Sequence, residues 1–208
     1  SHLPWELLHD GKCFLVAKFP PIVTVRWVGN DPITEEENPQ NRPLNLLFMA
    51  TSPRNVTPVL DYEAEEGFIL EATKRTPVNL KVEETGCLTE LNRLVGDYGN
   101  NYFDVFHLTG HAGHNDDKPC FYTEDEYGDV VYSDSDDIVR SLRCPSLPPL
   151  IFLSGCRTGY SSGGVIPSMA EEFVRKGAKA VIAWGETVND TEATLITKYF
   201  YSQLAQGN

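Results

Sequence analysis

A histidine and a cysteine follow two separate apolar runs of this sequence, each directly after a glycine. The run that starts at Phe103 leads to His111, and the run that starts at Leu150 leads to Cys156. Short continuous apolar runs are typical of buried parallel strands, and sites in open α/β sheets lie beyond the carboxyl ends of such strands. Because neighbouring strands are roughly 4.8 Å apart, residues just past two adjacent strand ends can meet. A thiol and an imidazole that meet there form a nucleophile and its base, which predicts a cysteine hydrolase.

Cys156 is the best candidate for the nucleophile among the five cysteines of the chain. It follows Gly155, and a glycine lets a substrate carbonyl approach the backbone closely. The backbone N–H of Cys156 would then donate to the oxyanion, and Arg157 would favour the thiolate. The alternative is a buried structural cysteine, since free cysteine is among the most buried residue types. The remaining cysteines show no CxxC or zinc-finger spacing: Cys13, Cys87, Cys120 and Cys144.

Three histidines compete for the role of the base. His107 falls within the predicted strand, where we expect it to be packed and hydrogen-bonded, and His114 lies further out, where we expect it to be solvated. His111 lies past Gly110, in the turn where a base is needed. On a helix, the three histidines would lie on one face, an arrangement that suits a metal site. The aromatic run and its two glycines favour a strand and a loop, so we predict no metal site.

Length and composition predict a single α/β domain with a short N-terminal addition. The 41% apolar and 11% aromatic content is that of a globular protein. A net charge of −13 argues against nucleic acid or an anionic membrane as the partner, and favours a basic partner or substrate segment. The sequence has no secretory signal and no apolar run of about 20 residues. We therefore expect a soluble cytoplasmic protein with free thiols.

From residue 44 onward, patterns for strands and helices alternate. Strands are predicted at 44–50, 78–82, 103–111, 150–156 and 180–184, and helices at 62–74, 89–98, 133–142, 167–176 and 190–205. Segments 120–122 and 129–132 are predicted to form a hairpin. This alternation predicts a mostly parallel sheet covered by helices on both faces. Residues 1–43 are predicted to form an N-terminal hairpin, with strands at 12–18 and 22–28, and then a linker.

Acidic residues cluster at the start of two predicted helices. The first set lies in the first turns of helix 62–74, where the helix dipole favours negative charge: Glu63, Glu65 and Glu66. At the second helix, Ser133 or Asp134 is the predicted N-cap. The carboxylates there are predicted to be a solvated helix start, with weak Ca²⁺ binding as the alternative: Asp134, Asp136 and Asp137.

The motifs HLTGHAG (107–113) and LSGCRTG (153–159) resemble the histidine and cysteine signatures of the CHAT domain, a caspase-like cysteine peptidase of clan CD. The resemblance covers residues 44–207. It includes LNLLFMATSP (44–53), EAEEGFILEA (63–72), MAEEFVRKGAKAVIAWGETVND (169–190) and KYFYSQLAQG (198–207). It implies a caspase-like three-layer sandwich over residues 44–208, in which a mostly parallel central sheet lies between helices on both faces. Residues 1–43 lie outside the resemblance.

The resemblance also implies roles for individual residues. His111 would be the catalytic base and Cys156 the nucleophile, with the backbone N–H groups of Ala112 and Cys156 forming the oxyanion hole. The family usually has a glycine directly after the histidine, whereas this chain has Ala112 followed by Gly113. Clan CD peptidases act with a Cys–His dyad, so no third acid, cofactor or metal is implied.

In related clan CD enzymes the S1 pocket uses the residue two before the cysteine, together with the strand and loop that follow. The corresponding residues of this chain are Ser154, Trp184, Gly185, Glu186 and Asp190. Glu186 or Asp190 would bind a basic P1 side chain. For Asp190 the alternative is the N-cap of the last helix.

The resemblance therefore implies an endopeptidase that cleaves a protein or peptide substrate through a thioester. CHAT domains usually lie behind sensor or scaffold regions such as TPR arrays, so we expect an activating region in the same or an associated chain. The expected role is in bacterial (antiviral) defence or regulated cell death. An inactive caspase-like scaffold is one alternative, based on Ala112. A cysteine hydrolase that does not act on peptides is another.

Overall fold

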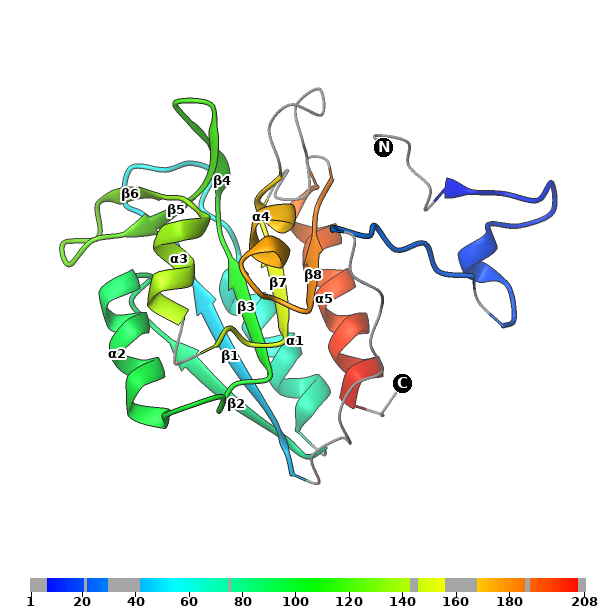
Figure 1. Ribbon diagram of the computed structural model, residues 1–208, viewed down its shortest axis with the longest axis horizontal. Helices are drawn as coiled ribbons and strands as arrows, with labels where there is room; N and C mark the ends of the chain where they lie inside the picture. The colour runs from blue at the N-terminus through cyan, green and yellow to red at the C-terminus, as the bar shows by residue number, and fades with distance from the viewer. Residues whose placement is uncertain are drawn as a thin grey trace.

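A five-stranded parallel sheet forms the centre of the structure, in the order β2-β1-β3-β7-β8 (Figure 1). Its strands are β1 (Leu44–Ala50), β2 (Val78–Glu83), β3 (Val105–Thr109), β7 (Leu150–Ser154) and β8 (Ala180–Ala183). This computed structural model describes residues 7–20, 22–29, 42–74, 76–142, 146–155, 168–185 and 188–205. The five strands predicted for the core are all formed, each within a few residues of its expected bounds.

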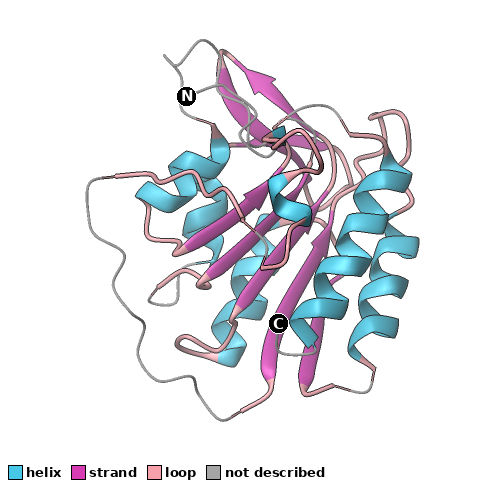
Figure 2. Cartoon of the chain, turned by 90° about the vertical axis from the view of Figure 1, so that its right-hand side faces the viewer, coloured by secondary structure: helices cyan, strands magenta, loops and turns pink. Residues whose placement is uncertain are grey.

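Helices cover both faces of this sheet (Figure 2). One face carries α1 (Tyr62–Thr73) and α5 (Asp190–Ala205), and the other carries α2 (Leu88–Tyr98), α3 (Ser135–Leu142) and α4 (Met169–Arg175). Each face has its own apolar cluster. The cluster under α1 and α5 contains Leu46, Phe48 and Tyr201, whereas Leu47 and Met49 belong to the cluster under the other three helices. The predicted three-layer α/β class is confirmed.

Burial on both faces explains why the core strands have continuous apolar sequences. Successive side chains of a strand point to opposite faces, so a strand between two helical layers needs apolar residues at every position. In β1, the five residues from Asn45 to Met49 are all buried, and all five residues of β3 are buried. The one histidine among them, His107, is therefore held inside the protein.

A second, antiparallel sheet of three strands lies beyond the carboxyl ends of β1 and β3, at the top of Figure 1. It consists of β4 (Ala112–Asn115), β5 (Lys118–Glu124) and β6 (Val130–Ser133). The predicted hairpin corresponds to β5 and β6. The prediction of a loop after the histidine strand was wrong, because β4 pairs with β5 from Ala112 onward. β4 has no apolar run, so its strand conformation depends on the pairing with β5 rather than on its own pattern.

The two strands predicted near the N-terminus are not formed. A short 3-10 helix, η2 (Leu15–Ala17), replaces the first, and residues 22–28 have no regular secondary structure. Val23, Val25 and Trp27, which lie in the second predicted strand, are exposed. The pattern was misleading because no strand among the described residues pairs with this segment, which extends away from the two sheets (Figure 1). The division of the chain at residue 43 remains a prediction.

None of the described helices combines the length and the apolar character needed to cross a bilayer.

Candidate active site

The ends of β3 and β7 lie side by side, as the sequence predicted. Thr109 is the register partner of Ser154 across the two parallel strands. The backbone N–H of Gly110 donates to the Ser154 carbonyl at 3.2 Å, and the Thr109 hydroxyl lies 3.4 Å from the same oxygen. The segments that continue to His111 and Cys156 therefore leave the sheet from adjacent positions. Cys156 itself lies outside the described residues.

His111 is half-buried between β3 and β4, and its ring is oriented by a backbone carbonyl. The Nε2 atom lies 2.6 Å from the carbonyl oxygen of Pro58, in the loop between β1 and α1. Because a carbonyl oxygen only accepts hydrogen bonds, Nε2 must carry the proton. In the neutral ring, Nδ1 is then the nitrogen that is left to accept a proton. The loop carbonyl thus selects the tautomer that a general base requires.

Two glycines permit the close packing of these turns. A Cβ atom on Gly110 would overlap the hydroxyl of Thr51. A Cβ atom on Gly155 would lie 2.6 Å from Cζ of Phe121 and 3.1 Å from the Cβ of Ala112. The residue directly before Cys156 therefore packs against the residue directly after His111. This contact brings the two predicted oxyanion-hole segments together.

Ala112 does not need to be a glycine in this structure. It is the first residue of β4, pairs with Phe121, and takes an ordinary strand conformation rather than one with positive φ. Its methyl group packs against the main apolar cluster. The departure from the family pattern therefore leaves the backbone geometry at this position unstrained.

Ser154 is buried and points toward α1 rather than toward solvent. Its hydroxyl donates to Oε1 of Glu65 at 3.1 Å. Thr197 of α5 donates to the same oxygen at 2.6 Å, and His107 Nε2 lies 3.3 Å from it. Ser154 was predicted to line the S1 pocket, and the structure shows that its hydroxyl already has a buried partner.

His107 is packed and hydrogen-bonded, as predicted. Its ring is completely buried, is stacked on Phe152 with centroids 4.4 Å apart, and has Nδ1 3.0 Å from the Tyr201 hydroxyl. Burial acts to raise the pKa of Glu65, but the charge and hydrogen bonding of His107, with the hydroxyls of Thr109 and Thr197, outweigh it and lower the pKa to about 2. Burial, and next the charge of Glu65, raise the pKa of Tyr201. A buried carboxylate and a buried imidazole, with Oε1 and Nε2 3.3 Å apart, therefore lie directly behind the two strand ends.

Glu65 lies in the first turn of α1, as predicted, but the sequence analysis did not anticipate its burial: only 3% of this residue is exposed. The sequence did contain a signal for its burial. Glu65, Ile69 and Thr73 are spaced by four residues each, and these three are the buried residues of α1. Positions i, i+4 and i+8 share one helix face, so Glu65 belongs to the face that packs on the sheet.

The other predicted pocket residues follow β8. Trp184 is half-buried, with its ring 6.4 Å from Phe152, and Gly185 is exposed. Glu186 and the side chain of Asp190 lie outside the described residues. The cap prediction for Asp190 was wrong, because the side chain of Asn189 accepts from the Glu192 N–H at 2.9 Å and caps α5. Asp190 is the first residue of that helix.

The histidine spacing that suggested a metal site does not form a helix face. His107 lies in β3, His111 in the turn, and His114 in β4. Within the described ranges, no group of three or more His, Cys, Asp or Glu side chains is placed to hold a metal ion.

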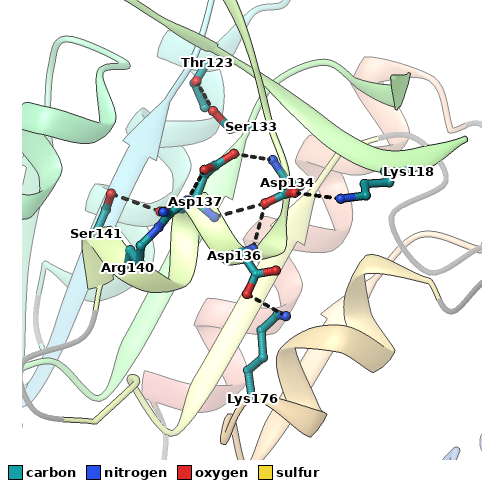
Figure 3. Close-up of polar contacts among 9 residues, drawn as sticks. All are labelled: Lys118, Thr123, Ser133, Asp134, Asp136, Asp137, Arg140, Ser141 and Lys176. Atoms are coloured by element: carbon teal, nitrogen blue, oxygen red, sulfur yellow. Dashed lines mark hydrogen bonds and ion pairs between the residues drawn. The ribbon is translucent and has the colours of Figure 1, made fainter. Parts of the chain in front are cut away.

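The aspartates at the start of α3 cap that helix (Figure 3). Asp134 Oδ1 accepts from the N–H groups of Asp136 and Asp137 at 2.9 and 3.1 Å, and Asp137 Oδ2 accepts from the Asp134 N–H at 3.1 Å. Of the two predicted caps, the structure selects Asp134. The outer carboxylates pair with cations, Asp136 with Lys176 and Asp137 with Arg140. This reciprocal capping accounts for the cluster without a Ca²⁺ ion.

Cys120 is a poor nucleophile at neutral pH. It is buried in β5, and burial is the main cause that raises the pKa of its thiol to about 11. Cys13 and Cys87 are half-buried free thiols. Cys144 lies outside the described residues.

The sheet order, the two helical layers and the paired strand ends are those of a caspase-like α/β domain. The model of the CHAT domain family matches residues 1–208, the whole length of the chain. This chain belongs to the CHAT domain family. The match includes the first 43 residues, which the motif resemblance did not reach. A comparison with individually curated proteins gave no match.

A first prediction concerns the buried pair. Glu65→Gln removes the anion beside His107, and breaking a buried pair typically costs about 3–5 kcal/mol. Urea unfolding near neutral pH should show that the free energy of unfolding falls by about 3 kcal/mol.

The pH dependence of this loss follows from the pKa of Glu65. Because this pKa is lower in the folded protein, the Glu65 carboxylate of the unfolded chain is protonated first as the pH falls. The stability from Glu65 is complete above about pH 5 and is lost as the pH falls towards the lowered pKa. The difference between wild type and variant should therefore shrink in acid, and a difference that grows would contradict an ionised Glu65.

A second prediction concerns Gly155→Ala. The new methyl group would meet the ring of Phe121, which is fully buried and cannot move aside. Overpacking of this kind typically costs about 1–3 kcal/mol. Gly67→Ala is the control, because a Cβ there meets nothing within 4 Å and a helical Gly→Ala change should stabilise by up to about 1 kcal/mol. Thermal unfolding of both variants measures the contrast, and a neutral Gly155→Ala would mean that the contact with Phe121 is loose.

Proposed function

We propose that this CHAT domain is a cysteine endopeptidase with His111 as the base and Cys156 as the nucleophile. The observation that carries the proposal is the bond from His111 Nε2 to the Pro58 carbonyl, which leaves Nδ1 as the proton acceptor at the end of β3. The adjacent end of β7 leads directly into Gly155 and then Cys156. A second support is the family itself, whose domain is caspase-like.

The chain's own groups are sufficient for the reaction. His111 Nδ1 would take the proton of the Cys156 thiol, and the thiolate would attack the carbonyl carbon of the scissile peptide. The N–H groups of Ala112 and Cys156 would donate to the oxyanion. The imidazolium would then protonate the leaving amine and form the thioester, which water hydrolyses with His111 again acting as base. The Pro58 carbonyl would stabilise the imidazolium by continuing to accept from Nε2.

The substrate pocket is proposed to lie between Ser154 and the residues after β8. Because the Ser154 hydroxyl is bonded to Glu65, preference for a basic P1 residue would depend on Glu186 and Asp190. The net charge of −13 also favours a basic substrate segment.

The resemblance supports a further part of the proposal, that this domain is the effector of a larger regulated system. An activating sensor or scaffold, such as a TPR array, would lie in the same or an associated chain. The proposed setting is the cytoplasm, in bacterial antiviral defence or regulated cell death. The alternative of an inactive scaffold was based on Ala112. The unstrained strand backbone of Ala112 weakens that argument.

A third prediction tests the peptidase. Incubation of a diverse peptide library with wild type should give cuts, read by mass spectrometry, that are absent with Cys156→Ala and with His111→Ala. Ala112→Gly should keep activity within about threefold of wild type, because the backbone at this position is already unstrained.

Two variants serve as matched controls for the peptide library. His114→Ala removes an exposed histidine of β4, and Cys120→Ala removes a buried thiol with a raised pKa. Both should keep wild-type cutting. Cuts that persist in Cys156→Ala, or that disappear in folded Cys120→Ala, would show that Cys156 is not the nucleophile.

A further inference from the structure

A buried carboxylate lies directly behind the strand that leads to Cys156. Glu65 Oε1 accepts hydrogen bonds from Ser154 of β7 and Thr197 of α5, and lies 3.3 Å from Nε2 of His107 in β3. One oxygen atom on α1 therefore contacts three other elements of the fold. A buried charge is costly unless it has partners, so the groups of β7, α5 and β3 around Oε1 account for a carboxylate at this position.

Ser154 links this carboxylate to the nucleophile. It is the last residue of β7 and lies two positions before Cys156. Its side chain is bonded to Glu65, while its carbonyl accepts from the Gly110 N–H on the histidine side. Both the hydroxyl and the peptide of Ser154 are thus fixed at the point where the chain leaves the sheet.

We propose that Glu65 is a positioning residue for the nucleophile. By holding the Ser154 hydroxyl, it sets the direction in which the chain leaves β7 and so presents Cys156 to His111. The inference rests on the proposed dyad. Its physical basis is that hydrogen bonds are directional, and a displacement of about 1 Å between reacting groups can cost on the order of 100-fold in rate.

The test measures the reactivity of Cys156 itself. Each protein is treated with iodoacetamide at neutral pH, quenched at intervals, digested with trypsin and analysed by mass spectrometry for alkylated Cys156. All variants carry Cys144→Ala, because trypsin cuts after Arg143 and Arg157 and would otherwise release both cysteines in one peptide. Circular dichroism under the same conditions confirms that each protein is folded.

Glu65→Gln and Ser154→Ala should each slow alkylation of Cys156 by about 10-fold. If Glu65 acts through Ser154, the double variant should be no slower than either single variant, because residues in one network give non-additive effects. Ser154→Thr restores the hydroxyl and should return the rate to within about threefold of wild type. A double variant slowed by about 100-fold, or single variants with unchanged rates, would overturn the proposal. If Glu65→Gln does not fold, the Ser154→Ala and Ser154→Thr pair still decides it.

Two controls separate positioning from general stability. Glu63→Gln changes an exposed carboxylate on the same helix and should alter neither stability nor alkylation. Thr197→Val removes the 2.6 Å bond to the same Glu65 oxygen without touching β7, so it should lower stability while the alkylation rate stays within about twofold. A Thr197→Val protein as slow as Ser154→Ala would show that Glu65 only stabilises the fold.

The alkylation assay also separates this inference from the proposed dyad. His111→Ala in the same background should slow alkylation because the base is lost. If it does not, the dyad is wrong, while comparison of the Glu65 and Ser154 single variants with their double variant still reports on the position of Cys156. If His111→Ala slows the reaction but the effects of the Glu65 and Ser154 variants simply add, the positioning role is wrong and the dyad stands.

Discussion

The hydrogen bond from the Gly110 N–H to the Ser154 carbonyl is the constraint on which the candidate site depends. It extends the pairing of β3 and β7 one residue beyond the last strand position, so the two chains separate at one defined place. Gly110 and Gly155 make this possible, because side chains there would collide with Thr51 and Phe121. The sheet therefore fixes Gly110 and Ser154, which lie one residue before the proposed base and two before the proposed nucleophile.

The buried pair of Glu65 and His107 has a high desolvation cost, which hydrogen bonds to both side chains offset in part. The carboxylate receives two hydroxyl hydrogen bonds, and the imidazole has the Tyr201 hydroxyl on one side and the stacked ring of Phe152 below. Such pairs rarely add net stability compared with apolar residues of the same volume. Instead, the pair fixes the positions of α1, α5, β3 and β7 relative to one another. It lies next to the candidate site.

The sequence predicted those features that depend on local pattern. The buried strands and most helix boundaries were correct because burial on both faces requires continuous apolar runs, and because caps such as Asp134 act within a few residues. The burial of Glu65 was not predicted, since the first turn of α1 contains both the exposed Glu63 and the buried Glu65, and only contact with the sheet decides between them. The segment 22–28 has a strand pattern but no pairing partner among the described residues, and β4 has a partner but no pattern. In both cases pairing is a tertiary property that the local sequence does not encode.

The strand that the sequence did not reveal, β4, has a direct consequence for His111, the proposed base. The loop that supplies the Pro58 carbonyl is fastened to the second sheet at two points, by Ser52 N–H to Glu124 Oε1 at 2.8 Å and by Arg54 N–H to the Gly128 carbonyl at 3.0 Å. That sheet is in turn joined to His111, whose own carbonyl accepts from Tyr122 N–H at 2.9 Å. The loop with the acceptor that fixes the His111 tautomer and the backbone that carries the ring are therefore both hydrogen-bonded to the second sheet. The small sheet thus positions the histidine, just as β7 and Glu65 position the chain that leads to the cysteine.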